Sequence, residues 1–254
     1  MMKLNITHQF SKAADTYDQF STLQNHIGHD LISLFPKTIS GNLLEIGSGT
    51  GSFTQFIHQT YPKKKITCID PSKEMIHEAQ KKQPLSTIKF KQSSIEQFKS
   101  TTYYGGIFSN ASLQWVEHFG EVLEKIKTLM NKEGFFIFSI LGPQTMGELR
   151  NCLSKFFRQS VFLSSSFFLS GESLYEQLSQ HFEFFSITEK KILVPFKDSL
   201  SLLKTIHYTG TRGRGLPNNH FWTPGTLRQL DSLFKTYFGR VEVTYQVFFI
   251  TCRS

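Results

Sequence analysis

Apolar positions recur along this chain in two rhythms, as short continuous runs and as longer stretches with helical spacing. The runs predict buried strands at residues 43–46, 65–69, 87–91, 106–109 and 135–141. The stretches predict helices at residues 22–35, 53–61, 73–82 and 119–130, with a short irregular lead before the first and a short helix near Ile95. Strand and helix alternate, so we expect a parallel, doubly wound α/β sheet.

The regular alternation of strand and helix patterns ends after residues 142–143. Helical patterns at 146–159 and 171–181 precede a long strand candidate at 184–194, and two more helices are expected at 199–206 and 223–237. The run 241–252 alternates and is rich in β-branched residues, which predicts an antiparallel last strand. We therefore expect a Rossmann-like sheet of seven strands with a terminal hairpin, and a helical insertion over its carboxyl-terminal edge.

The segment 43–51 combines a buried strand with a glycine-rich turn that opens a helix. Gly47, Gly49 and Gly51 allow positive φ and leave a concave surface without side chains. Asp70 ends the next strand, and a carboxylate there can accept both hydroxyl protons of a ribose. The glycine-rich turn and Asp70 together indicate a cofactor that contains ribose.

The spacing of this turn bears on which cofactor that is. The turn is G-x-G-x-G, whereas the dinucleotide fingerprint is G-x-G-x-x-G with a pyrophosphate on the helix N-terminus. S-adenosylmethionine has no phosphate, and Glu45 could help to hold its cationic end by hydrogen bonding and charge. The same carboxylate would repel a pyrophosphate, so the residues favour S-adenosylmethionine over NAD. The turn by itself also fits a plain strand-to-helix connection.

Composition agrees with one main domain of 254 residues. The aromatic stretch 156–168 is interrupted by polar residues, and the first residues lack a signal-peptide core, so we expect no membrane span and a cytoplasmic protein. Cys68, Cys152 and Cys252 specify neither a disulfide framework nor a metal site. The net charge of +8 is compatible with nucleic acid or with an acidic protein partner.

Several segments carry a family resemblance. The glycine turn, the run Asp70-Pro71-Ser72 with Met75 and Ala79 after it, and Gly134 resemble the class I S-adenosylmethionine-dependent methyltransferases. More narrowly, the chain is similar to the malonyl-acyl-carrier-protein O-methyltransferases of biotin synthesis. That similarity rests on segments 10–17, 109–115, 202–206, 209–211 and 244–248, of which 109–115, with its Asn-Ala-Ser-Leu-Gln-Trp, is the most discriminating.

The resemblance implies an enzyme that methylates the free carboxylate of a malonyl group on acyl carrier protein or coenzyme A, using S-adenosylmethionine. The methyl ester would start pimeloyl and biotin synthesis. It also implies a division into an N-terminal helical lid (1–42), a cofactor-binding core (43–142), a helical substrate cap (143–182) and a C-terminal part that completes the sheet and carries a substrate loop (183–254).

Site residues follow from the same resemblance. Cofactor-binding positions are Glu45, Gly47, Ser48, Gly49, Gly51, Asp70, Pro71, Met75, Ser94, Ile95, Asn110 and Leu113. Substrate-binding positions are Gln114, Trp115 and Lys204, and the catalytic candidates are Tyr17 in the lid with Arg150, Arg212 and Arg214, since a guanidinium binds a carboxylate in fixed planar geometry. The chain departs from the family pattern at Ser94, where many members have Asp, and at Glu45, which replaces a more common Asp.

Three functions stay open at this stage. The first is methylation of malonyl carrier protein or of another small carboxylic acid. The second is a nucleic-acid methyltransferase, favoured by the pI of 9.3 but disfavoured because segment 110–113 is not the Asn-Pro-Pro-aromatic motif that holds a flipped base. The third is a non-catalytic assembly factor. We expect acyl carrier protein as the partner, neither nucleic acid nor membrane, and the sequence does not fix the oligomeric state.

Overall fold

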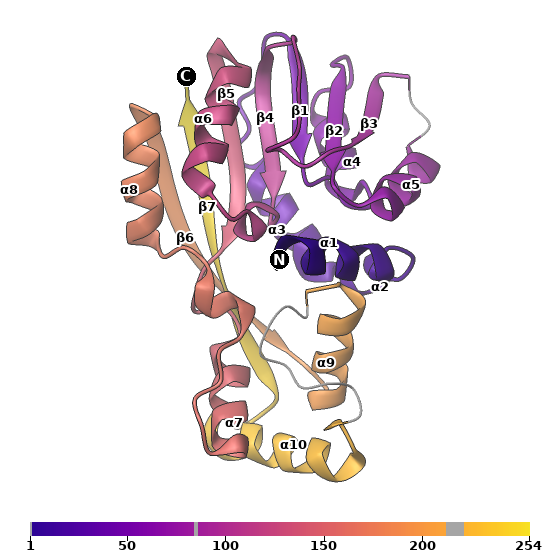
Figure 1. The fold of residues 1–254 in the computed structure, drawn as a ribbon, viewed down its shortest axis with the longest axis vertical. Coiled ribbons are helices and arrows are strands. Elements are labelled where there is room, and N and C mark those ends of the chain that lie inside the picture. Colours follow the sequence, from indigo (N-terminus) through magenta and orange to yellow (C-terminus); the bar gives the residue numbers. More distant parts are fainter. Residues whose placement is uncertain (1, 84–85, 212–220) are drawn as a thin grey trace.

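A seven-stranded sheet forms the centre of the molecule (Figure 1). The computed structural model describes residues 2–83, 86–211 and 221–254. The strand order is β3-β2-β1-β4-β5-β7-β6, and β7 is antiparallel to both neighbours while the other pairs are parallel. The strands are β1 (Asn42–Ile46), β2 (Ile66–Asp70), β3 (Ile88–Gln92), β4 (Tyr104–Asn110), β5 (Met130–Leu141), β6 (Phe184–Pro195) and β7 (Glu242–Arg253). The predicted α/β class and the antiparallel last strand are confirmed.

Helices cover both faces of the sheet. In the described ranges they are α1 (Met2–Ala13), α2 (Tyr17–Phe20), α3 (Thr22–Ile32), α4 (Ser52–Thr60), α5 (Lys73–Lys82), α6 (Phe119–Leu129), α7 (Gly147–Phe157), α8 (Gly171–His181), α9 (Ser199–Tyr208) and α10 (Pro224–Phe238), with the short 3₁₀ turns η1 (Leu113–Trp115) and η2 (Ser164–Phe167). Helices α3 and α4 bury their apolar stripes on one face, and α6 and α8 bury theirs on the other. This is the layered arrangement that a parallel sheet requires.

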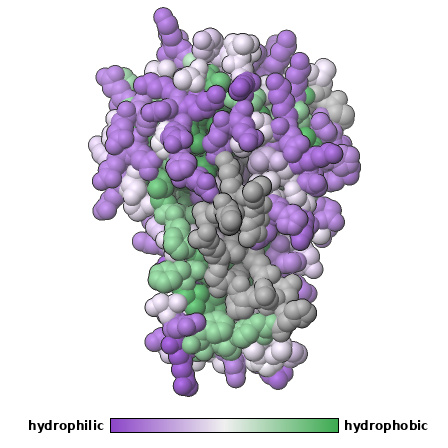
Figure 2. Space-filling model, viewed as in Figure 1, coloured by the Kyte–Doolittle hydropathy of each residue, from purple (hydrophilic) through white to green (hydrophobic). Residues whose placement is uncertain are grey.

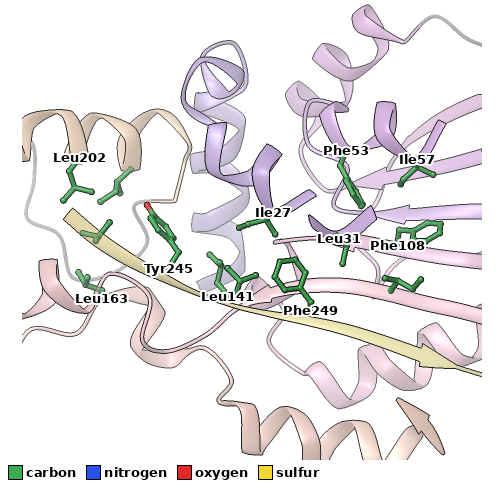
Figure 3. Close-up of a cluster of buried hydrophobic side chains, with 14 of the residues drawn as sticks. Ile27, Leu31, Phe53, Ile57, Phe108, Leu141, Leu163, Leu202, Tyr245 and Phe249 are labelled. Atoms are coloured by element: carbon green, nitrogen blue, oxygen red, sulfur yellow. The ribbon is translucent and has the colours of Figure 1, made fainter. Parts of the chain in front are cut away.

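One hydrophobic cluster joins the sheet to the part of the molecule that lies below it in Figure 1, which we call the lower half and which contains α7, α9 and α10 (Figure 3). It begins with Phe53 and Ile57 of α4, continues through Ile27 and Leu31 of α3, and reaches Tyr245 of β7. Leu163 and Leu202, from the segments beyond the parallel strands, belong to the same cluster. The two halves therefore share one continuous core.

The lower half is carried by an extension of the last two strands. β5 pairs with β7 only from residue 247 onward, whereas β6 pairs with β7 along its whole length, down to Pro195 opposite Glu242. The paired ends of β6 and β7 thus project as a two-stranded ribbon past the carboxyl end of β5, and α7, α9 and α10 surround it (Figure 1). Ligands of open α/β sheets bind at this carboxyl edge, so the ribbon brings the lower helices to the side where a site is expected.

The N-terminal lead differs from its expected irregular form, because α1 is a helix of 12 residues. Ile6, Phe10 and Ala13 are spaced four and three apart, which places them on one helical face, and Ile6 and Ala13 are buried. The apolar stripe was too short to be distinguished from a loop on sequence alone.

Two further expectations are wrong in detail. The segment at Ile95 is a single turn closed by the Phe98 N–H on the Ser94 carbonyl (2.9 Å), and it does not continue as a helix. β6 and β7 are antiparallel neighbours, but α9 and α10 lie between them in the chain, so they are not a hairpin. An alternating strand pattern reveals a strand but does not reveal how it is connected to its neighbour.

The surface in Figure 2 is hydrophilic over most of the upper half and carries an apolar strip along one side of the lower half. Phe162, which precedes η2, and Phe167, the last residue of η2, are exposed. Within the described ranges no helix is both long and apolar enough to cross a membrane, and no group of three metal-binding side chains occurs. Cys68, Cys152 and Cys252 are buried free thiols.

We expect Phe108→Ala to lower the free energy of unfolding by about 3–5 kcal/mol, because Phe108 is completely buried and stacks on Phe35 at 4.2 Å between ring centroids. Urea denaturation measures the loss. The matched control is Phe167→Ala, since that ring is 59% exposed and should cost little. Equal losses in the two variants would contradict this account of the core.

Candidate active site

The glycine-rich turn after β1 forms one wall of a cavity at the carboxyl edge of the sheet. Gly49 has φ +53°, lines the cavity, and has no atom within 4 Å of the position that a Cβ would take. Gly47 has φ +72°, and a Cβ there would lie 2.0 Å from the Ser112 hydroxyl. The turn thus needs glycine for two different reasons, close packing at Gly47 and an open approach at Gly49.

Asp70 fastens this turn to the end of β2. Its Oδ2 accepts the Gly49 N–H (3.0 Å) and its Oδ1 accepts the Ser72 N–H (2.9 Å). Each carboxylate oxygen keeps a lone pair for a further donor, and Asp70 lines the cavity. Burial raises the pKa of Asp70 to about 6, against the lowering effect of the two backbone hydrogen bonds. The carboxyl is therefore ionised at neutral pH.

Glu45 lies behind the turn and is not among the residues that line the cavity. Its Oε2 accepts hydrogen bonds from the Thr54 hydroxyl (2.5 Å) and the Cys68 thiol (3.4 Å). Burial raises its pKa to about 8, although both hydrogen bonds oppose the shift. Glu45 therefore carries a proton at neutral pH, and the structure places it where it supports α4 through Thr54.

Most of the sequence-predicted cofactor positions converge on the cavity. Its lining includes Tyr17, Gly47, Gly49, Asp70, Pro71, Met75, Ser94, Ile95, Asn110, Leu113, Gln114 and Trp115. Ser48 and Gly51 belong to the turn but are not part of this lining, and Gly51 packs against Ala79 of α5. The structure thus brings most of these positions together at the carboxyl edge of the sheet.

The first two helices cover the cavity. Ser11 of α1 meets Ser72 through their hydroxyls (2.9 Å), and Phe10 packs edge-on against Trp115 at 6.0 Å between ring centroids. Asp18 of α2 accepts hydrogen bonds from the hydroxyl groups of Thr50 (2.5 Å) and Ser52 (3.3 Å), and it pairs with Lys82. The lid is therefore attached to both helices that follow the cofactor-facing strands.

Tyr17 projects from this lid into the cavity lining. Burial raises the pKa of its phenol well above the usual value, and the nearby Asp70 and Asp18 carboxylates raise it further. Its hydroxyl is a neutral hydrogen-bonding group at physiological pH and does not act as a base.

Asn110 and Gln114 line the cavity at the end of β4, and the side chain of each already makes a hydrogen bond within the protein. The Asn110 Nδ2 donates to the Gln24 carbonyl (2.8 Å) and its Oδ1 accepts from the Ser139 hydroxyl (2.7 Å). The Gln114 Nε2 donates to the Ala111 carbonyl (2.7 Å), while its Oε1 is buried without a partner. Asn110 therefore ties α3 to the sheet, and Gln114 keeps one acceptor for a ligand.

A second cavity adjoins the first and extends into the lower half. Leu23, Gln24, Trp115, Leu141 and Thr211 line both cavities. The second also contains Thr145, Leu149, Phe168, Val194, Phe196 and Tyr245, from α7, the ribbon and neighbouring loops. A donor in the first cavity and an acceptor in the second would meet at this junction.

Neither of the two predicted cations within the described residues lines either cavity. Arg150 of α7 donates from Nη1 to the Ser166 hydroxyl (3.3 Å) and lines neither cavity. Lys204 is exposed on α9 and is likewise absent from both linings. Arg212 and Arg214 lie outside the described residues, directly after Thr211.

Sequence reasoning missed the part of the lining that comes from the N-terminal helices and from the loops beside the turn. These residues are Ile6, Thr7, Phe10, Leu23, Gln24, Ile27, Ser72, Ser93, Glu96, Ala111 and Ser112. The sequence contains one weak indication for Gln24, which is a polar residue directly beside the apolar stripe Leu23-Ile27-Leu31 of α3.

The chemistry of the first cavity fits S-adenosylmethionine. Asp70 can receive the two ribose hydroxyl groups, the bare backbone at Gly49 leaves room for the ligand, and the unpartnered Gln114 oxygen can accept from its ammonium group. The charged residues in the described lining are Asp70 and Glu96, both acidic, which suits a cationic sulfonium. A pyrophosphate would find no cation there.

We expect S-adenosylmethionine affinity to fall as the pH drops below 6, because protonated Asp70 loses acceptor capacity towards ribose. With a pKa of about 6, only ~10% of the carboxyl is ionised at pH 5, so the apparent Kd rises about tenfold. Calorimetric titration from pH 5 to 8 measures this. Asp70→Asn should bind more weakly at every pH and show a flat profile, and a flat wild-type profile would contradict the assignment.

Glu45→Gln should leave cofactor affinity within a few-fold while changing how stability depends on pH. The pKa of Glu45 is about 8 in the folded protein and near the usual carboxyl value when unfolded. Between those values unfolding releases a proton, so the free energy of unfolding falls as the pH rises towards 8. Urea denaturation from pH 5 to 9 should show a steeper fall in the wild type than in Glu45→Gln. A large loss of affinity in the variant would instead support direct contact of Glu45 with the cofactor.

Comparisons with known proteins agree with the geometry. Residues 44–138 match the family described as Methyltransferase domain. The chain is 28% identical over 239 residues to malonyl-[acyl-carrier protein] O-methyltransferase 1 of Ilyobacter polytropus, covering 93% of this chain and 88% of that protein. It is 34% identical over 144 residues to malonyl-[acyl-carrier protein] O-methyltransferase of Anoxybacillus flavithermus, covering 56% of this chain and 54% of that protein.

Solved structures show the same fold. The plantazolicin methyltransferase BpumL in complex with SAH superposes with a TM-score of 0.54 at 19% identity, covering 99% of this chain and 95% of that one. The YcgJ protein of Bacillus subtilis superposes with a TM-score of 0.62 at 11% identity, covering 90% and 98%. The resemblance stated from the sequence is confirmed, and S-adenosylmethionine is the cofactor. The chain therefore contains a methyltransferase domain at residues 44–138 and has the fold of the plantazolicin methyltransferase.

Proposed function

We propose that the protein methylates the free carboxylate of a malonyl group carried as a thioester on acyl carrier protein. The single observation that carries this is the similarity to malonyl-[acyl-carrier protein] O-methyltransferases over nearly the whole chain. The adjoining cavities support it, because the second cavity, whose described lining is uncharged, can take a thioester arm while the first holds the cofactor. By the resemblance, the product would enter biotin synthesis.

The described residues suit this reaction because it requires little acid–base chemistry. A carboxylate is already ionised at neutral pH, so no general base is needed. S-adenosylmethionine supplies an electrophilic methyl group on a sulfonium. The protein has to hold the acceptor oxygen in line with that methyl group and to exclude water, and α1 and α2 over the first cavity are placed for this.

Roles for individual residues follow within the proposal. Asp70 receives the ribose, Ser94 and Ile95 contact the adenine, and Gln114 receives the ammonium end. Tyr17 covers the methionine end or the acceptor from the lid. The net charge of +8 favours an acidic carrier protein as partner. The three buried free thiols suit a reducing compartment, and we place the protein in the cytoplasm.

Incubation with methyl-labelled S-adenosylmethionine and malonyl carrier protein should place a base-labile label on the carrier. Acetyl carrier protein is the matched control, since it has the same arm without a free carboxylate and should stay unlabelled. Transfer RNA in a parallel reaction should also stay unlabelled. Label in RNA and none in malonyl carrier protein would overturn the proposal.

A further inference from the structure

The junction of the two cavities is where the acceptor oxygen has to reach the methyl group. Its described lining consists of Leu23, Gln24, Trp115, Leu141 and Thr211. Three of these carry hydrogen-bond donors, namely the Gln24 amide, the Trp115 indole and the Thr211 hydroxyl. The Thr211 hydroxyl already contacts Thr209 Oγ1 (2.9 Å), so we consider Gln24 and Trp115 as the hydrogen-bond donors for a ligand at the junction.

Charge is distributed unequally between the cavities. None of the described residues that line the second cavity is charged, and the first contains Asp70 and Glu96. An acceptor carboxylate that enters through the second cavity therefore meets no cation from the described part of the chain. Recognition by a guanidinium would have to come from Arg212 or Arg214, which follow Thr211 in the sequence.

The backbone of Gln24 is fixed to the sheet, while the oxygen of its side-chain amide has no hydrogen-bond partner. Its backbone carbonyl accepts the Asn110 Nδ2 (2.8 Å), and Asn110 is in turn bonded to Ser139 of β5, so this turn of α3 is fixed to the sheet. Its Oε1 is buried without a partner. A buried polar atom without a partner costs free energy and is typical of a site that a ligand completes. A carboxylate ligand needs a donor at this position. Rotation of the side-chain amide by half a turn places Nε2 where Oε1 lies and so supplies that donor.

We propose that the Gln24 amide binds the carboxylate of the acceptor at the junction and so determines specificity for a free carboxyl group. This rests on the proposed function. An amide N–H holds one carboxylate oxygen and leaves the other free to attack the methyl carbon, whose bond to sulfur breaks as the new bond to oxygen forms. A neutral donor lowers the nucleophilicity of the carboxylate less than a guanidinium would, because it withdraws less charge.

The test compares Gln24→Leu, which removes the donors at similar volume, with Gln24→Glu, which keeps the shape and adds a repelling charge. We expect the KM for malonyl carrier protein to rise about tenfold or more in Gln24→Leu, since a hydrogen bond to a charged group contributes roughly that much affinity, and to rise further in Gln24→Glu. The Kd for S-adenosylmethionine should stay within a few-fold in both. Gln80→Glu, on the exposed face of α5, is the matched control and should leave both constants unchanged.

A second measurement isolates the carboxylate. Wild-type protein should bind malonyl pantetheine more tightly than acetyl pantetheine, and Gln24→Leu should lose most of that difference. If thermal unfolding shows that Gln24→Leu is not folded, the binding of malonyl and acetyl pantetheine is compared in Gln24→Glu instead.

Three results would overturn the proposal. These are an unchanged KM in both Gln24 variants, a loss confined to S-adenosylmethionine affinity, and a loss of malonyl binding in Arg212→Ala or Arg214→Ala with none at Gln24. A wild-type enzyme that binds S-adenosylmethionine but never methylates malonyl carrier protein would instead refute the proposed function, which separates the two failures.

Discussion

The two hydrogen bonds accepted by Asp70 determine the position of almost everything else at the carboxyl edge of the sheet. One fixes the Gly49 N–H and with it the turn after β1, and the other fixes the Ser72 N–H at the start of α5. Ser72 then caps α5 through the Met75 N–H (3.2 Å) and meets Ser11 of the lid. A single buried carboxylate thus connects the glycine turn, the next helix and the lid. The same carboxylate keeps its remaining lone pairs directed at the cavity.

Burial acts on two acids of this region with opposite consequences. Glu45 is the more strongly shifted, with a pKa near 8, and serves as a neutral partner of Thr54 and Cys68 inside the protein. Asp70, with a pKa near 6 and two backbone N–H donors, stays ionised at the cavity wall. Two backbone N–H donors lower the pKa of Asp70, whereas the Asp70 charge adds to the burial that raises the pKa of Glu45, so Asp70 is the acid that contributes negative charge to the site. The sequence places both acids beside the turn and does not distinguish them.

Much of the fold could be predicted, because strand and helix patterns depend on neighbours in sequence. The order of elements from β1 to β5 and the helices α5 and α8 follow from apolar spacing, and so do the residues that end the strands. Pairing at long range could not be predicted, since the apolar patterns of β6 and β7 do not show that these two strands pair across the intervening α9 and α10. The site divides in the same way. Asp70, Gly49 and Gln114 follow strand ends, whereas Gln24 reaches the cavity only because α3 packs across β4.

The position of the reaction centre follows from how the two halves are joined. The ribbon of β6 and β7 extends the sheet past β5, so the second cavity is built against the same Leu141 and Trp115 that close the first. Under the proposed function, methyl transfer to a carboxylate requires alignment more than proton transfer, so its rate would depend on how rigidly these shared walls hold two ligands end to end. The described linings of the two cavities accordingly contain neither a histidine nor a cysteine. Specificity is then left to the few polar groups at the junction, among which we propose the Gln24 amide as the group that binds the acceptor carboxylate.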